Sequence, residues 1–265
     1  MPRGGAGMTE HVIVWDLETI PDLDAVGRAH GLPKGDLDAA REVLADKFPK
    51  LPFHQIACIG AVVAERIDHI WCVNAIGAPH IGDRSERDLI AAFVEKIGIL
   101  RPRLVSFNGN SFDLPVLRYR AMMHRISAPG LEARGYFKRY TDDATDLCDV
   151  LSSFDGRSKM KLNDLCLALN LPGKPDGIDG SQVAGYFAAG RIVEVADYCE
   201  CDVVSTYRLW LLHELFKGDL SVEQYEQSEL MLSKFIDARI QEKPHWGRLV
   251  SSAIVQTELK MILAG

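Results

Sequence analysis

The sequence has no apolar stretch long enough to cross a membrane, no low-complexity tract and no internal repeat. None of its six cysteines forms a C-x-x-C pair and no secretory signal precedes them, so neither disulfides nor a zinc site is expected. Basic residues are in the minority, with 30 Lys and Arg against 37 Asp and Glu and a net charge of −7. This balance argues against a protein that coats long duplexes, because such binding depends on neutralising phosphates. The same charge balance is compatible with an enzyme that binds only the end of a nucleic-acid strand.

What remains is an ordinary globular composition, with 47% hydrophobic and 25% charged residues. A chain of 265 residues can bury a full core, and one α/β domain is the simplest expectation. The Gly-rich start lacks the apolar segment of a signal peptide. Residues 1–10 are therefore expected to be a flexible leader of a cytoplasmic protein that has no contact with a membrane.

Hydrophobic periodicity predicts a mixed order of strands and helices. Strands are predicted at His11–Leu17, Gln55–Val63, Ile67–Ile76 and Leu104–Asn108. Helices are predicted at Ser85–Leu100, from Ser111 onward, and at Lys161–Leu169, Gly180–Gly190, Ile192–Phe216 and 221–264. Residues 21–50 are predicted to be a helical insertion, and 141–151 fit no single state. Three consecutive strands followed by alternation with helices predict an α/β fold, a mixed sheet of three antiparallel strands plus parallel strands, flanked by helices.

Two carboxylates end the first strand. Side chains alternate between the faces of a strand, so Asp16 and Glu18 project to the same side, roughly 7 Å apart at their Cα atoms. Acid-x-acid pairs recur elsewhere in the chain, and chance explains most of them. This pair differs because it terminates an apolar strand, where unpaired carboxylates are unfavourable and a cation relieves their repulsion.

Asp113 lies in the segment FNGNSFDLP, residues 107–115. Ser111 is predicted to cap the next helix, which places Asp113 in the first turn of that helix. An acid there also interacts favourably with the helix dipole, so this segment alone fits a structural role equally well.

Tyr198 and Asp202 are four residues apart and therefore share one face of the predicted 192–216 helix. That face is otherwise mostly apolar, and the opposite face is predicted to carry Asp197, Glu200, Val204 and Arg208. A carboxylate on an apolar face needs a partner. A metal ion would serve, and so would a hydrogen bond from a buried Ser or Arg. Together the three segments supply four carboxylates, the hard oxygen ligands that Mg²⁺ and Mn²⁺ prefer.

The segments WDLET (15–19), FNGNSFDLPVL (107–117) and YCECDV (198–203) resemble the three exonuclease motifs of the DEDD superfamily. The likeness runs from about His11 to Phe216. It is closest to the 3′→5′ exonuclease (proofreading) domains of B-family DNA polymerases, here expected as a stand-alone protein. Tyrosine four residues before Asp202 indicates the DEDDy subclass. The histidine subclass would have His where this chain has Asp197.

The resemblance implies a ribonuclease-H-like fold for residues 11–218, with residues 219–265 as a helical tail on the same domain. It also implies two Mg²⁺ or Mn²⁺ ions as cofactors. Asp16 would bridge both ions, Glu18 and Asp202 would complete one site, and Asp113 would hold the second ion partly through water.

Three further residues receive expected roles from the same resemblance. Tyr198 would orient the attacking water, a positioning role more than proton abstraction at its ordinary pKa of roughly 10. Asn108 matches the asparagine of the second motif and is expected to contact the terminal nucleotide. Lys174 follows a stretch similar to stand-alone relatives and is expected to meet a phosphate.

The expected substrate is a single-stranded or frayed 3′ end, with DNA favoured over RNA and mononucleotides as products. An exoribonuclease remains an alternative, since discrimination by the 2′-hydroxyl depends on local contacts. A non-catalytic module that binds nucleic acid is less favoured, because it has no use for buried carboxylates. A partner polymerase or repair protein cannot be named from the sequence.

A basic run is the remaining feature that suggests nucleic acid. Between Arg118 and Tyr140 there are six basic residues and one acid, Glu132, interleaved with aromatic side chains that can stack on bases. A solvated helix and loop that happen to be basic explain the composition equally well.

Overall fold

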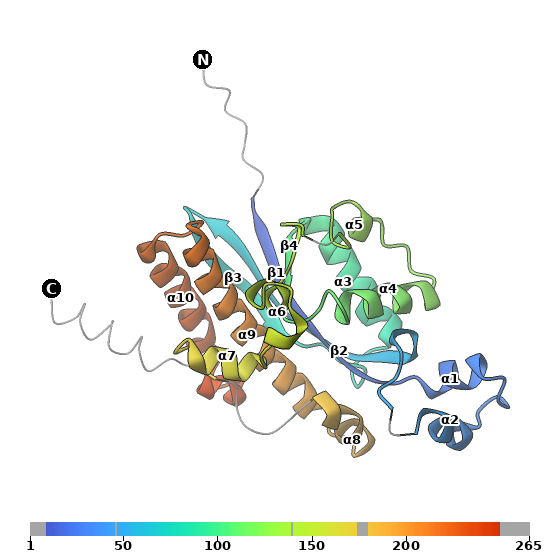
Figure 1. The fold of residues 1–265 in the computed structure, drawn as a ribbon. Coiled ribbons are helices and arrows are strands. Elements are labelled where there is room, and N and C mark those ends of the chain that lie inside the picture. Colours follow the sequence, from blue (N-terminus) through green and yellow to red (C-terminus); the bar gives the residue numbers. More distant parts are fainter. Residues whose placement is uncertain (1–8, 46, 139, 174–179, 250–265) are drawn as a thin grey trace.

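The computed structural model describes residues 9–45, 47–138, 140–173 and 180–249. Five strands form one sheet in the order β3-β2-β1-β4-β5 (Figure 1). Their bounds are His11–Pro21 for β1, His54–Ile67 for β2, Ile70–Gly77 for β3, Arg103–Ser106 for β4 and Ala144–Asp146 for β5. The pairs β1–β2 and β2–β3 are antiparallel, whereas β1–β4 and β4–β5 are parallel. This ribonuclease-H-like arrangement confirms the predicted mixed sheet.

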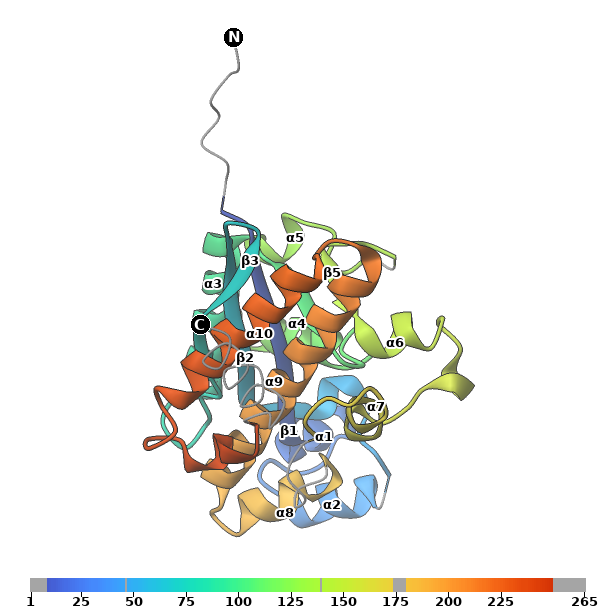
Figure 2. The same ribbon diagram turned by 90° about the vertical axis from the view of Figure 1, so that its left-hand side faces the viewer.

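Helices cover both faces of the sheet. On one face lie α3 (Glu86–Leu100), α4 (Asp113–Met123) and α5 (Pro129–Glu132), and on the other lie α9 (Ile192–Lys217) and α10 (Val222–Asp237), which Figure 2 shows in front of the strands. The shorter helices are α1 (Leu23–Ala29), α2 (Leu37–Leu44), α6 (Leu147–Leu151), α7 (Leu162–Ala168) and α8 (Val183–Ala188). Single 3₁₀ turns are η1 (Leu51–Phe53), η2 (Gly156–Ser158), η3 (Gly180–Gln182) and η4 (Pro244–Arg248). Among the described residues, no helix combines the length and the apolar character that a membrane crossing needs.

The central strand β1 is buried on both sides, which explains its continuous apolar run. Val12 and Val14 belong to the core under α9 and α10, whereas Ile13, Trp15 and Leu17 belong to the core under α3 and α4. Continuing this alternation places the even-numbered residues that follow on the α9 face.

Helix α9 is buried on nearly every side, including the side opposite Asp202 to which the sequence assigns Glu200 and Arg208. Glu200 is 2% exposed and Arg208 is 1% exposed. Glu200 accepts hydrogen bonds from Lys243, His245 and the indole of Trp246, while Arg208 pairs with Glu229 of α10. Helix α10 and the segment after it cover this side of α9.

Other predicted elements fit with shifted limits. The insertion at 21–50 contains α1 and α2, and the ambiguous residues 141–151 form β5 followed by α6. The helix predicted over 221–264 ends at Asp237 and is followed by turns and η4, and residues 250–265 lie outside the described chain.

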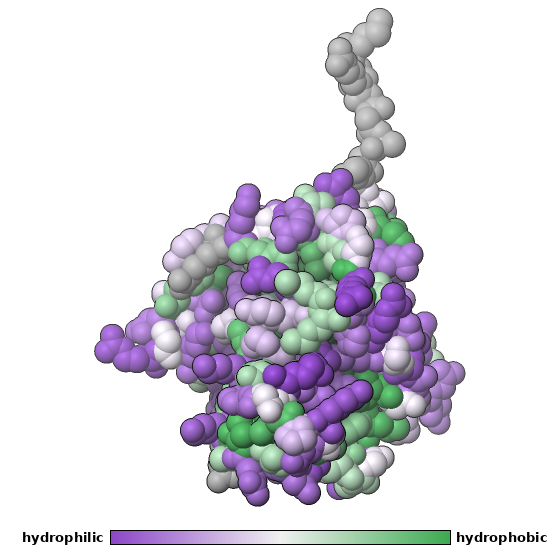
Figure 3. Space-filling view, turned by 90° about the vertical axis from the view of Figure 1, so that its right-hand side faces the viewer, coloured by the Kyte–Doolittle hydropathy of each residue, from purple (hydrophilic) through white to green (hydrophobic). Residues whose placement is uncertain are grey.

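On the face with α1 to α5, hydrophobic patches among hydrophilic side chains gather toward the end that holds α1 and α2 (Figure 3).

The basic run from Arg118 to Tyr140 divides into structural and surface groups. Arg120 is buried and binds Glu86 through a two-pronged contact and also Asp22. Arg134 pairs with Asp143 and donates to the carbonyls of Arg101 and Pro102. Tyr136 is 1% exposed, with its hydroxyl donating to Pro102, so it cannot stack on a base.

Arg120→Lys is expected to lower the free energy of unfolding by about 2 kcal/mol, because a lysine cannot reproduce the planar fork that binds Glu86. The exposed Arg125 is a matched control, and Arg125→Lys should stay within about 0.5 kcal/mol of wild type. Urea unfolding of the three proteins measures the difference. Identical midpoints and slopes would show that Arg120 has no structural role beyond its charge.

Candidate active site

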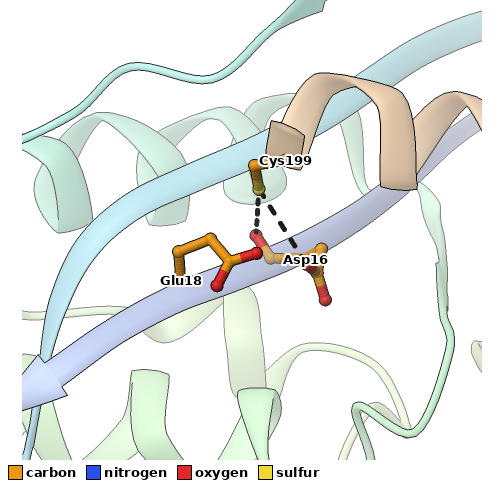
Figure 4. Close-up of side chains that lie close together, drawn as sticks. All are labelled: Asp16, Glu18 and Cys199. Carbon is orange, nitrogen blue, oxygen red and sulfur yellow. Dashed lines mark hydrogen bonds between the residues drawn. The ribbon is translucent and has the colours of Figure 1, made fainter. Parts of the chain in front are cut away.

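The carboxylates of β1 lie together on the side that α9 covers. Oxygen atoms of Asp16 and Glu18 and the Sγ of Cys199 are all within 4.8 Å of one another (Figure 4). Glu18 is only 6% exposed. The pairing of β1 with β2 shifts register just after Glu18, so the regular alternation holds through both acids. Asp16 is half-buried. Two carboxylates this close repel each other, and a cation between them would remove the repulsion.

Helix α9 carries the third motif segment, residues 198–203, and its close approach to β2 brings that segment to Asp16 and Glu18. Gly60 of β2 lies opposite Asp16, and a Cβ at Gly60 would be 2.5 Å from Cys199 Sγ and 3.2 Å from the Cys199 carbonyl oxygen. The absence of a side chain therefore lets α9 lie directly on the sheet. The Cys199 thiol is 3.9 Å from both the carbonyl and Oδ2 of Asp16. Sequence reasoning missed Cys199, although it falls inside the third motif.

Asp113 is held beside the same strand. It is the first residue of α4 and is 4% exposed. Its Oδ1 accepts a hydrogen bond of 3.0 Å from the backbone N–H of Leu17, the residue between Asp16 and Glu18. Burial raises the pKa of Asp113 to about 7, with Asp146 adding to the effect and the Leu17 hydrogen bond opposing it. A carboxyl with this pKa carries its negative charge readily once a cation is near.

The turn before Asp113 depends on two backbone features. Asn108 has φ +70°, a left-handed conformation that asparagine tolerates. A Cβ at Gly109 would lie 2.4 Å from the Ser106 hydroxyl, so only glycine fits there. The predicted cap at Ser111 is wrong, because its hydroxyl donates to the Asn108 backbone and side-chain oxygens and α4 has no side-chain cap.

Asp146 at the end of β5 is a site residue that the sequence did not reveal. It is 1% exposed and accepts hydrogen bonds from the backbone N–H groups of Asn108 and Asn110. It therefore fixes the turn that carries Asp113. The side chain of Asn108 in turn accepts a hydrogen bond of 3.0 Å from Lys159. The segment around Asp146 was ambiguous in the sequence, and no motif marked the residue.

Tyr198 and Asp202 lie on α9 near the carboxylates of β1. Tyr198 is 9% exposed. Burial is the largest of the effects that raise the pKa of Tyr198 well above its ordinary range. The pKa is raised further by the charges of Asp202, Glu18 and Asp16 and by a hydrogen bond to Asp202. The phenol is therefore neutral at physiological pH. These contacts bring the four acids and the tyrosine predicted from the motifs into one region. Asn108 lies in the turn that precedes Asp113. Lys174 lies outside the described residues.

The ligand atoms gathered here suit a hard divalent cation. Carboxylate oxygens are the ligands that Mg²⁺ and Mn²⁺ prefer, and a thiolate would instead favour a softer metal. A hydrogen bond to Cys58 and burial raise the pKa of the Cys199 thiol well above its ordinary value, which disfavours the thiolate. The carboxylate oxygens are the donors of this group that suit a hard cation.

The central strand of the mixed sheet thus carries the half-buried Asp16 and the buried Glu18 beside Asp113 and α9. The chain belongs to the family described as "predicted 3′-5′ exonuclease related to the exonuclease domain of PolB", whose model matches residues 46–253. Exonucleases of this type depend on divalent metal ions. The match includes the segments of Asp113, Tyr198 and Asp202 and begins after β1. The contacts of Asp16 and Glu18 with the matched segments connect β1 to the site.

Solved structures with similar folds are larger proteins. The family B DNA polymerase from the hyperthermophilic archaeon Pyrobaculum calidifontis has 17% identity and a TM-score of 0.49 over 78% of this chain and 24% of its own. E. coli exonuclease I in complex with a dT13 oligonucleotide has 14% identity and a TM-score of 0.39 over 77% of this chain and 41% of its own. The chain thus spans less than half of either structure. No curated protein matches it.

Proposed function

We propose that the protein is a two-metal 3′→5′ exonuclease that hydrolyses the last phosphodiester bond of single-stranded or frayed DNA and releases mononucleotides. The observation that carries the proposal is the convergence of the three motif segments. The backbone between Asp16 and Glu18 binds Asp113, and α9 contacts Asp16 through Cys199. Carboxylates placed this close together repel each other, and a bound cation would offset that repulsion.

The proposed ligands divide between two ions. Asp16 would be shared, Glu18 and Asp202 would complete the first set, and Asp113 would belong to the second. When bound, such ions supply an activated water and stabilise the leaving 3′ oxygen. The chain holds these carboxylates through backbone contacts: Leu17 fixes Asp113 and the turn of Asn108 and Gly109 sets the start of α4. Asn108 is proposed to contact the terminal nucleotide, and the role of Lys174 in binding a phosphate remains a proposal from sequence.

Tyr198 is proposed to orient the attacking water, since its neutral hydroxyl faces the carboxylates and cannot act as a base. Tyr198→Phe should lower kcat by about 10²-fold, the effect of misplacing a reacting group, and leave Mn²⁺ affinity nearly unchanged. Rates of nucleotide release under saturating substrate, together with Mn²⁺ titration followed by thermal unfolding, separate the two quantities. An unchanged kcat would remove Tyr198 from the reaction, and a large loss of Mn²⁺ affinity would make it a ligand instead.

A nuclease assay tests the whole proposal. Oligonucleotides of one sequence, as single-stranded DNA, duplex DNA and single-stranded RNA, are incubated with Mn²⁺ or Mg²⁺ and with excess EDTA. The expected result is shortening from the 3′ end that requires metal and is faster on single-stranded DNA than on a blunt duplex. Faster hydrolysis of RNA would make the protein an exoribonuclease. Hydrolysis that continues in EDTA would contradict the metal-dependent mechanism.

A further inference from the structure

A cavity of about 480 Å³ opens directly beside the turn that carries Asp113. Asn110, Ser111 and Leu114, which surround Asp113 in sequence, line one wall. The lining also includes the 136–138 segment and residues from α6 to the position just after η2. The volume lies in the range of ligand sites, which is roughly 300–1,000 Å³. None of the proposed metal ligands lines this cavity.

The cavity is cationic in a protein that is acidic overall. Its lining includes Arg118, Lys138 and Lys159 against the single acid Asp149. Lys159 forms an ion pair with Asp149, at 2.7 Å, and donates a hydrogen bond to the side chain of Asn108. Among the described residues, neither Arg118 nor Lys138 forms an ion pair with a carboxylate. Two positive charges are thus available to an anion next to a site whose own side chains are acids.

Arg118 is held in place without losing its hydrogen-bonding groups. Its guanidinium lies over the ring of Phe137, with 4.5 Å between the guanidinium carbon and the ring centroid. Stacking fixes the plane of the guanidinium while its N–H groups stay free to bind phosphate oxygens.

An aromatic side chain borders the same space. Ser153 and Phe154 are both in the left-handed region, with φ of +53° and +60°. A bulky residue rarely adopts this conformation, which is maintained only where the surroundings require it. Phe154 lines the cavity and packs edge-on against Tyr140 at 4.7 Å, and Tyr140 is 74% exposed. The strained turn thus presents an aromatic ring at the cavity.

Cationic groups combined with aromatic rings are the surface that binds single-stranded nucleic acid, since phosphates meet the cations and bases stack on the rings. We infer that this cavity binds the one or two nucleotides that precede the residue being removed, with their phosphates on Arg118 and Lys138 and a base on Phe154. The inference rests on the proposed function for the position of the 3′ end. The proposed preference for single-stranded substrates would then come from this cavity, because the stacked and paired bases of a duplex cannot enter the cavity.

The test compares two double variants with the same change of charge. Arg118→Ala/Lys138→Ala removes the cavity cations, and Arg87→Ala/Lys96→Ala removes two exposed cations of α3. Binding of a fluorescent 12-nucleotide single strand is measured by anisotropy in Ca²⁺ over a range of salt. The cavity variant should bind at least about tenfold more weakly and show a salt dependence shallower by about one to two units of slope, whereas the control should match wild type. Equal binding by the two variants would overturn the proposal.

Stacking is tested separately with Phe154→Ala and Phe154→Tyr. Alanine should weaken binding at least about fivefold and tyrosine should restore it, because a base–aromatic stack needs only the ring. Restoration by Phe154→Leu as well would show that the ring is not used, which contradicts the stacking contact.

A small substrate distinguishes a failure of this inference from a failure of the proposed exonuclease function. Thymidine 5′-monophosphate p-nitrophenyl ester has one nucleoside and cannot span the cavity. The cavity variant should hydrolyse it at the wild-type rate while its KM for the 12-nucleotide strand rises. If wild type hydrolyses neither substrate, the exonuclease proposal fails, and the binding comparison still decides the role of the cavity. If the cavity variant loses both activities equally, the cavity is part of the catalytic fold and the inference fails.

Discussion

Asp16→Asn is expected to lower the rate of 3′-end hydrolysis by about 10³-fold and to leave the protein folded. Asp16 interacts with Cys199 and Tyr198 of α9, and it lies next to Leu17, whose backbone N–H binds Asp113. The amide keeps the size and shape of the side chain and removes its charge. Release of a 3′-labelled nucleotide in Mn²⁺ measures the effect.

Two measurements show whether the loss comes from metal binding. Mn²⁺ should raise the Tm of wild type, because a ligand that binds only the folded state stabilises it, and should raise the Tm of Asp16→Asn much less. Without metal the variant should be at least as stable as wild type, since one of two repelling charges is gone. Asp24→Asn, an exposed acid of α1, is the control and should behave as wild type. Undiminished hydrolysis by Asp16→Asn would remove it from the reaction.

Gly60→Ala is expected to lower the rate by about 10²-fold, although Gly60 has no functional group. The added Cβ would clash with the Cys199 sulfur and press on the Cys199 carbonyl oxygen and Val203. Because these atoms belong to α9, the helix must shift away from the sheet, and Tyr198 and Asp202 shift with it. The overpacking should also lower the free energy of unfolding by about 1–3 kcal/mol.

Gly77→Ala is the matched control for this change. Gly77 ends the neighbouring strand β3, and nothing lies within 4 Å of an added Cβ there. It should retain activity and stability. Mn²⁺ affinity distinguishes displacement of α9 from simple loss of fold, since a folded Gly60→Ala protein should bind Mn²⁺ more weakly. A folded variant with normal rate and affinity would show that α9 has room to adjust.

The sheet was predictable because its strands carry continuous apolar runs. The order of three antiparallel strands before the parallel ones could be read from the succession of strands and helices. The proximity of Asp16 and Glu18 followed from the two-residue period of a strand, which needs no tertiary information. The grouping of the three motif segments was not visible in periodicity and came from the resemblance to a family.

Other features depend on tertiary contacts that no local pattern contains. The burial of Glu200 and Arg208 on α9 could not be predicted, because α10 and residues 243–249 supply their partners from far along the chain. The cap predicted at Ser111 failed because Asn108, in a left-handed conformation, takes its hydroxyl. Asp146 caps α6 locally, but its link to the site was missed because it binds backbone groups 36 and 38 residues away.

The burial of Glu200 makes the last described segment part of the catalytic unit. Lys243, His245 and Trp246 supply every hydrogen bond described for its side chain, two residues from Tyr198 and Asp202. A protein cut at Gly218, after α9, would expose the apolar side of that helix and leave a carboxylate without these donors at its centre. The smallest fragment able to hold the Tyr198 helix in register with β1 therefore extends at least to Leu249, whose carbonyl binds Arg208.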